Sequence, residues 1–271
     1  MSKNLRRKQT HRMTTYNTIG SQYNQTRTAD PYLAQTLFGL LQPQPEGVCL
    51  DIGCGTGNYT ITLAHKGINM VGVEPSTLML EQAKTKSQSV KWQLGSAENI
   101  PFTDNYFDGA IGTLTIHHWS NLVLAFKELY RVLKPNARMV IFTSTAEQMQ
   151  GYWLNHYFPK MLESSIRQMP SYTAIESAVS EAGLKITANH KYYVKNDLQD
   201  KFLYVGKNQP KLYFDAQIRQ GISSFAALAN KEEVEQGLAQ LATDIERETF
   251  EKVKARYNDE LGDYLFVVIE K

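Results

Sequence analysis

The feature that most constrains this chain is a glycine-rich loop placed between an apolar run and a segment with helical spacing. The loop covers Asp51 to Gly57, with the sequence DIGCGTG, and follows the apolar residues 48–50 directly. Glycine lets the backbone turn tightly and lets a ligand approach it closely. In open parallel sheets, ligands bind at the carboxyl ends of the strands, where the strand order reverses. The loop therefore predicts a ligand site at the end of a buried strand.

Strands and helices alternate on both sides of this loop. A helix is expected over 30–41, with Asp30 as its N-cap and Pro31 at its first position. We then expect strands over 48–52, 68–73, 90–94, 107–114 and 137–143, separated by helices over 58–66, from Ser76 onward and over 120–133. Pro135 is expected to end the last of these helices. This alternation is typical of a parallel sheet covered by helices on both faces.

The second half of the chain is less regular. We expect a helical stretch over 148–169, a helix over 171–182, and strands over 184–194 and 263–270. The polar segment between those strands, 196–262, is expected to be mostly helical and to lie at one edge of the sheet. The expected fold class is therefore α/β: a doubly wound, mostly parallel, seven-stranded Rossmann-like sheet with a helical cap or insertion.

Composition excludes several other classes of protein. Of the 271 residues, 42% are hydrophobic and 21% are charged, which excludes a wholly disordered chain. The net charge of +2 is small for a protein that binds nucleic acid through phosphates, and no nucleic-acid partner is expected. No apolar run reaches the roughly 18 residues of a membrane span. The only cysteines, Cys49 and Cys54, indicate reduced thiols and a cytoplasmic protein rather than a disulfide scaffold.

The spacing of the glycines separates two classes of ligand. A dinucleotide fingerprint would place its third glycine at position 58, which is Asn58 here. The loop has an acidic residue two positions before its first glycine instead. A carboxylate there is a poor neighbour for a pyrophosphate and a good partner for an ammonium group. This favours a zwitterionic nucleoside over NAD. Neither a Walker loop nor a C-x-x-C or H-E-x-x-H motif occurs, and no metal site is expected.

The ordered motifs resemble those of the class I S-adenosylmethionine-dependent methyltransferases. The nearest group is the small-molecule methyltransferases related to ubiquinone and menaquinone biosynthesis. The resemblance covers about 48–145, with a weaker similarity over Tyr16 to Arg27. The matching segments are Asp51 to Gly57, Val73 to Ser76, Gly95 to Phe102, Phe107 to Ile111, Thr115 to Trp119 and Leu129 to Pro135.

The resemblance implies S-adenosylmethionine as cofactor and S-adenosylhomocysteine as product. It places the cofactor-binding residues in the glycine loop, at the ends of the next strands and in the N-terminal segment. They are Tyr16, Tyr23, Arg27, Asp51, Gly53, Cys54, Gly55, Gly57, Asn58, Glu74, Pro75, Ser76, Ser96, Ala97, Glu98, Thr113, Leu114 and Thr115.

Two carboxylates have the clearest expected roles. Glu74 stands 21 residues beyond Gly53, at the end of the adjacent strand, where it could accept hydrogen bonds from both ribose hydroxyls. An ordinary strand-end charge is the alternative. Asp51 could receive the methionyl ammonium directly or through water, or could only fix the glycine loop. Ser96 and Ala97 would flank the adenine, or belong to a polar loop.

The N-terminal segment is expected to close over the cofactor. Arg27 could pair with the cofactor carboxylate through two hydrogen bonds, and Tyr16 or Tyr23 could lie over the sulfonium. The alternative is an exposed helix with a surface arginine. His117 or His118 could act as a general base, or either could be a structural histidine or a wall of the pocket. A base is not required, because the sulfonium already activates the methyl group.

The expected reaction is SN2 transfer of a methyl group to O, N or C of a small-molecule acceptor. Two alternatives stay open: another use of the same cofactor, in cyclopropane formation or aminopropyl transfer, and a non-catalytic cofactor-binding partner protein. The expected units are a tail and cofactor-covering segment over 1–29, a core over 30–195 plus 263–271, and an insertion over 196–262. The insertion would form a cap with 148–169. The protein is expected to be a monomer or homodimer.

Overall fold

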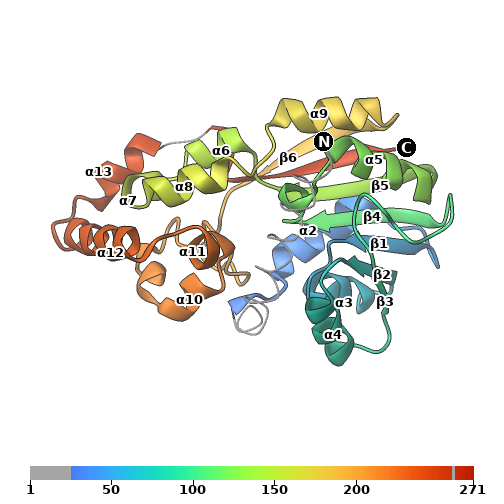
Figure 1. The fold of residues 1–271 in the computed structure, drawn as a ribbon, viewed down its shortest axis with the longest axis horizontal. Coiled ribbons are helices and arrows are strands. Elements are labelled where there is room, and N and C mark those ends of the chain that lie inside the picture. The colour runs from blue at the N-terminus through green and yellow to red at the C-terminus, as the bar shows by residue number, and fades with distance from the viewer. Residues whose placement is uncertain (1–25, 258–259) are drawn as a thin grey trace, which may run out of the picture.

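The computed structural model describes residues 26–257 and 260–271, in which a sheet region and a helical lobe lie side by side (Figure 1). The predicted cofactor contacts of Tyr16 and Tyr23 lie outside these residues. Among the residues that it describes, no helix has both the length and the apolar character needed to span a bilayer.

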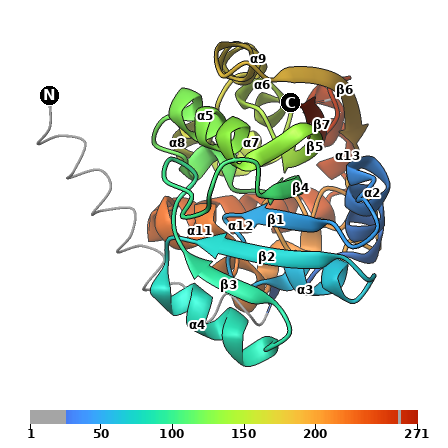
Figure 2. The same cartoon turned by 90° about the vertical axis from the view of Figure 1, so that its right-hand side faces the viewer.

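The sheet has seven strands in the order β3-β2-β1-β4-β5-β7-β6. Strands β1 to β5 run parallel, and β7 runs antiparallel to both of its neighbours. The order runs outward from the centre in two directions, so the switch point lies between β1 and β4, which are adjacent in Figure 2. This confirms the predicted fold class. The strands are Val48–Ile52, Asn69–Glu74, Lys91–Leu94, Phe107–Thr113, Leu133–Thr143, Lys185–Tyr192 and Tyr264–Glu270, from β1 to β7.

Helices cover both faces of the sheet. On one face, apolar side chains of α5 and α9 pack on β1, β4, β5 and β7 in one buried cluster, while α2 and α3 contribute to a second cluster on the other face. Asp30 caps α2 and Ser76 caps α4 through their side chains, as their residue types predict. The helices around the sheet are α2 (Pro31–Leu41), α3 (Asn58–Ala64), α4 (Thr77–Lys86), η1 (Ile116–His118), α5 (Leu122–Val132) and α9 (Tyr172–Glu181).

Two predicted elements differ in the structure. The prediction that Pro135 ends the helix before the fifth strand was wrong, because that helix ends at Val132 and β5 starts at Leu133. Pro135 lies where the β4–β5 register shifts, so its missing N–H breaks no regular ladder. The helical stretch over 148–169 is three short helices, α6 (Ala146–Gln150), α7 (Leu154–Tyr157) and α8 (Pro159–Ile166). Pro159 forces Phe158 out of helical geometry and separates the last two.

The segment between β6 and β7 is mostly helical, as expected, and packs with α6 to α8 (Figure 1). Its core is aromatic: Trp153 stands edge-on to both Tyr213 and Phe250, with ring centroids 5.6 and 5.1 Å away. We call this segment together with α6–α8 the cap. Its remaining elements are η2 (Pro210–Phe214), α10 (Ala216–Gln220), α11 (Ser223–Ala227), α12 (Lys231–Glu246), α13 (Phe250–Lys254) and η3 (Ala255–Tyr257).

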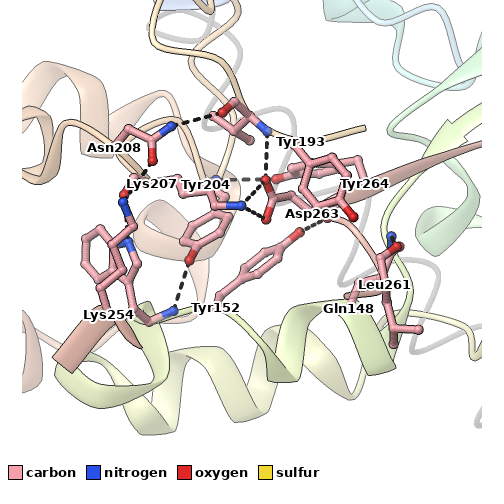
Figure 3. Close-up of polar contacts among 12 residues, drawn as sticks. Gln148, Tyr152, Tyr193, Tyr204, Lys207, Asn208, Lys254, Leu261, Asp263 and Tyr264 are labelled. Atoms are coloured by element: carbon pink, nitrogen blue, oxygen red, sulfur yellow. Dashed lines mark hydrogen bonds and ion pairs between the residues drawn. The ribbon is translucent and has the colours of Figure 1, made fainter. Parts of the chain in front are cut away.

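A buried polar cluster fastens the two ends of the insertion to each other (Figure 3). The Asp263 carboxylate accepts hydrogen bonds from Lys207 Nζ at 2.6 and 2.7 Å and from the Val194 N–H at 2.7 Å. The Tyr152 hydroxyl donates to the Asp263 carbonyl, and its ring stacks on that of Tyr204 at 4.0 Å. The insertion therefore leaves the sheet and returns to it at one fixed point.

Candidate cofactor site

A cavity of about 160 Å³ opens at the carboxyl ends of β1, β2 and β4, beside the switch point of the sheet. Parallel strands meet at this edge, so residues distant in sequence converge on it. The lining residues are Arg27, Asp51, Gly53, Cys54, Gly55, Thr56, Asn58, Tyr59, Glu74, Pro75, Met79, Ser96, Ala97, Glu98, Thr113, Leu114, Thr115, His118, Trp119 and Asp200.

The glycine loop forms one wall of this cavity because its backbone adopts conformations that other residues avoid. The φ angles of Gly53, Gly55 and Gly57 are +71°, +56° and +80°. A Cβ at Gly53 would stand 2.0 Å from the Thr115 hydroxyl, whereas at Gly55 the nearest atom would be 3.9 Å away. Close packing against Thr115 therefore explains why position 53 requires a glycine. The space at Gly55 fits the close approach of a ligand to the backbone.

Asp51 presents a buried carboxylate to the cavity. The residue is 2% exposed, and its Oδ2 accepts a hydrogen bond from the Thr60 hydroxyl at 2.6 Å. Its Oδ1 has no hydrogen-bond partner within the described residues. The pKa of Asp51 is raised to about 7, chiefly by burial and also by the nearby Glu74 charge, against the lowering effect of the Thr60 hydrogen bond. A buried oxygen without a partner, in a cavity wall, suits a cationic ligand group.

Glu74 supports the loop from the neighbouring strand. Its Oε2 accepts from the Gly55 N–H at 3.0 Å, and its Oε1 accepts from the Ser76 N–H at 2.9 Å. Each carboxylate oxygen has two lone pairs, so each can accept a further bond from a ligand hydroxyl. Burial raises the pKa of Glu74 from its ordinary value. Glu74 thus both fixes the glycine loop and lies among the residues that line the cavity.

The far wall comes from the segments after β3 and β4. Glu98 follows β3, and its Oε1 accepts from the Ser120 N–H at 2.5 Å and from the Ser120 hydroxyl at 2.8 Å, just before α5. The buried Thr113 hydroxyl has no hydrogen-bond partner within residues 26–257 and 260–271. It is a second buried polar atom without a partner on a residue of the cavity wall.

The two histidines differ in position although their ring centroids are only 3.9 Å apart. His118 lines the cavity and His117 is not among the lining residues. Both lie on the short η1 helix that follows β4. The structure thus leaves His118 as the histidine beside the site, and its role as a base stays a prediction.

An ion pair between Arg27 and Asp200 forms part of the cavity wall. Arg27 Nε donates to Asp200 Oδ1, and its Nη2 donates to Asp200 Oδ2 at 3.2 Å. The Tyr59 hydroxyl donates to the same Oδ2 at 3.1 Å. Asp200 belongs to the insertion, about 140 residues from α3, and no local pattern in the sequence marks it.

Most of the predicted cofactor residues that the structure describes meet at this cavity. Gly57 and Ser76 do not line it; they are the N-caps of α3 and α4, next to residues that do. The sequence reasoning missed five lining residues. Thr56 lies inside the glycine loop, Tyr59 follows Asn58 and Trp119 follows His118, so proximity could have found them, whereas Met79 and Asp200 carry no such signal. The five are Thr56, Tyr59, Met79, Trp119 and Asp200.

The charges in the cavity wall suit a ligand with cationic groups. Four carboxylates line it, at Asp51, Glu74, Glu98 and Asp200, and Arg27 neutralises only the last. S-adenosylmethionine carries a sulfonium, an ammonium and one carboxylate, so its net charge complements this wall. Among residues 26–257 and 260–271, no group of three or more His, Cys, Asp or Glu side chains could hold a metal ion.

Comparisons with known proteins agree with this geometry. The profile of a family described as "Methyltransferase domain" matches residues 50–141. A crystal structure from Anabaena variabilis, described as a methyltransferase of an antibiotic biosynthesis pathway, is 32% identical with a TM-score of 0.80. That match covers 91% of this chain and 99% of the other. The chain belongs to the class I S-adenosylmethionine-dependent methyltransferases.

Curated methyltransferases match over a shorter part of this chain. The demethylmenaquinone methyltransferase of Beutenbergia cavernae is 26% identical over 53% of this chain and 68% of its own length. The bifunctional biotin biosynthesis protein of Cellvibrio japonicus is 31% identical over 51% of this chain. The match spans only 28% of that longer protein. Similarity to the ubiquinone and menaquinone group is confirmed, and the cofactor of the family is S-adenosylmethionine.

Proposed function

We propose that the chain transfers a methyl group from S-adenosylmethionine to a small-molecule acceptor. One observation carries the proposal: two buried carboxylates, Asp51 and Glu74, stand at the ends of adjacent strands around a loop whose glycines all have positive φ. Together they offer sites for an ammonium group and for a pair of ribose hydroxyls. The Asp51 carboxylate, two positions before the first glycine of the loop, would be a poor neighbour for a pyrophosphate.

The residues that would hold the cofactor follow from their donors and acceptors. Glu74 would accept the ribose hydroxyls while keeping its bonds to the loop backbone, and Asp51 Oδ1 would receive the ammonium. Ser96 and Ala97 would flank the adenine. Arg27 would receive the methionyl carboxylate on its guanidinium, and Thr113 to Thr115 would face the methionyl chain.

When bound, the cofactor supplies a methyl group activated by the sulfonium. The residues of this chain then have three tasks: to orient the acceptor in line with the methyl, to exclude water, and to take a proton where the acceptor loses one. Trp119 and the cap would exclude water from the cavity. A ring nitrogen of His118 would take a proton from an acceptor hydroxyl, amine or activated carbon.

The names of the relatives and the net charge support a small acceptor. The curated relatives are named for small molecules, a menaquinone precursor and biotin. The net charge of +2 offers no general attraction for nucleic acid. Both cysteines are unpaired, which suits a reducing compartment such as the cytoplasm, and a monomer or homodimer would suffice for this site.

The test is a labelling experiment on the purified chain with methyl-labelled S-adenosylmethionine and a cell extract, read by mass spectrometry. The proposal predicts a labelled small molecule, whose structure shows whether O, N or C is methylated. Label on a protein or nucleic acid would contradict the small-molecule acceptor. An aminopropyl product, or cofactor binding without turnover on any acceptor, would contradict methyl transfer.

A further inference from the structure

Among the described residues of the insertion, Asp200 alone lines the cavity, and it is almost completely buried. Its side chain is 1% exposed, and that of its partner Arg27 is 12% exposed. The pair is a two-point contact, with Nε and Nη2 on the two carboxylate oxygens, and Tyr59 adds a third hydrogen bond. A buried carboxylate satisfied in this way fixes the direction of the guanidinium plane.

The backbone on both sides of Asp200 is tied to the same segment as Arg27. The Gln199 N–H donates to Asp30 Oδ2 at 2.9 Å, and the Lys201 N–H donates to the Thr26 carbonyl at 3.2 Å. The Asp30 carboxylate also caps α2. The insertion therefore contacts the N-terminal segment before, at and after Asp200.

The same contact reaches the glycine loop through α3. Asn58, the first residue of α3, donates from its side-chain amide to the Arg27 carbonyl at 3.0 Å. Tyr59, the next residue, accepts from the Asp30 N–H at 3.4 Å and donates to Asp200. Three chain segments that are distant in sequence thus meet around one carboxylate.

Resting on the proposed function, we propose that Asp200 is a positioning residue for the cofactor site. It holds the Arg27 guanidinium at the cavity wall, so that the insertion determines where Arg27 meets the methionyl carboxylate. Asp200 acts through Arg27 rather than by contacting the cofactor.

The physical reason is the flexibility of arginine. Its long side chain loses rotamer freedom when it is fixed, and an arginine that is already fixed binds a carboxylate without that loss. The guanidinium has five N–H donors in a rigid fork, so it can bridge two carboxylates. The opposing effect is competition, because Asp200 and the methionyl carboxylate both attract Arg27. The two effects change affinity in opposite directions, which makes the proposal testable.

The experiment is calorimetric titration of the full chain with two probes. S-adenosylhomocysteine carries the amino-acid carboxylate and ammonium, and 5′-methylthioadenosine has the same nucleoside and sulfur without either group. The variants are Asp200→Asn, Arg27→Gln and the double variant. Asp263→Asn is the matched control, because it also breaks a buried ion pair of the insertion, with Lys207, outside the cavity lining.

We expect Asp200→Asn to weaken S-adenosylhomocysteine binding by about tenfold or more and 5′-methylthioadenosine binding by less than about twofold. The double variant should bind no more weakly than Arg27→Gln alone, since Asp200 acts through Arg27. The control Asp263→Asn should keep its affinity for both probes. Asp200→Glu, which keeps the charge and displaces the carboxylate, should show a smaller loss in the same pattern and serves if Asp200→Asn does not fold.

Unchanged or tighter binding of S-adenosylhomocysteine by Asp200→Asn would overturn the proposal, because it would show that Asp200 competes with the ligand carboxylate for Arg27. Equal losses of affinity for both probes would also overturn it, because they would show that the substitution damages the site as a whole. Losses that add in the double variant would show that Asp200 acts on the ligand directly. Failure of the proposed function is a separate result: the unaltered chain would then bind neither probe, or would bind them and methylate no acceptor in the labelling experiment.

Discussion

Replacing Asp51 by asparagine should change how the stability of the protein depends on pH. Asp51 is buried, and its pKa is raised from 3.8 to about 7, first by burial and then by the nearby charge of Glu74. The folded protein therefore holds a proton on Asp51 between those two pH values, whereas the unfolded chain does not. The contribution of Asp51 to stability is therefore fully present below the ordinary pKa of an aspartate and is lost as the pH rises toward 7.

The size of the effect follows from the shift. Each pH unit between the two pKa values costs about 1.4 kcal/mol, so ionising Asp51 lowers the free energy of unfolding by about 4 kcal/mol in total. Between pH 5 and pH 8 the shift predicts a loss of about 3 kcal/mol. Asparagine cannot ionise and keeps an acceptor for the Thr60 hydroxyl, so the variant should lack this loss.

The assay is urea unfolding of both proteins, without cofactor, at several pH values from 5 to 8. The free energy of unfolding of Asp51→Asn, minus that of the unaltered chain, should rise by about 3 kcal/mol across the series. Asp108→Asn is the control: burial raises the pKa of Asp108, but the hydrogen bonds from Lys134 and the Val48 N–H, together with the Lys134 charge, outweigh this and the pKa is lowered. The free energy of unfolding of Asp108→Asn, minus that of the unaltered chain, should not change between pH 5 and pH 8. A difference in unfolding free energy that does not change with pH for Asp51→Asn would refute the reasoning.

The remaining predictions concern the cofactor and the loop. Affinity for S-adenosylmethionine should rise with pH up to about 7 and then level off, because only ionised Asp51 attracts the ammonium; calorimetry across pH should show this dependence in the unaltered chain and not in Asp51→Asn. Gly57→Ala should destabilise the fold by at least about 2 kcal/mol in urea unfolding, since its φ is +80° and the new Cβ would stand 2.4 Å from the Trp92 ring. Gly67→Ala, with φ +90° and open space, should cost only about 1 kcal/mol, and equal costs would contradict the packing argument.

The sheet region could be predicted from the sequence because its signals are local. The strand 48–52 is a short apolar run, the loop after it is rich in glycine, and the caps Asp30 and Ser76 are residues that prefer that position. The break at Pro159 was also visible in the sequence, because a proline excludes helical geometry at the residue before it. The start of β5 at Leu133 was not visible in the sequence, since it depends on pairing with Phe107.

The cofactor site was predictable only in part, because local signals in the sequence mark only some of its residues. Asp51 and Glu74 follow from strand ends and spacing, because parallel strands bring such positions together. Asp200 could not be found this way. It stands in a polar loop of the insertion, and only tertiary packing brings it to Arg27 and Tyr59. The separation of His118 from His117 likewise depends on which ring faces the cavity.

The most direct test of the cofactor site is calorimetric titration of the purified, folded chain with S-adenosylhomocysteine, beside the variant Glu74→Ala. We predict one binding site per chain, no binding of NAD, and an affinity about tenfold or more lower in Glu74→Ala, which loses the acceptor for the ribose hydroxyls. Absence of binding by the unaltered chain, or an unchanged affinity in Glu74→Ala, would contradict the account.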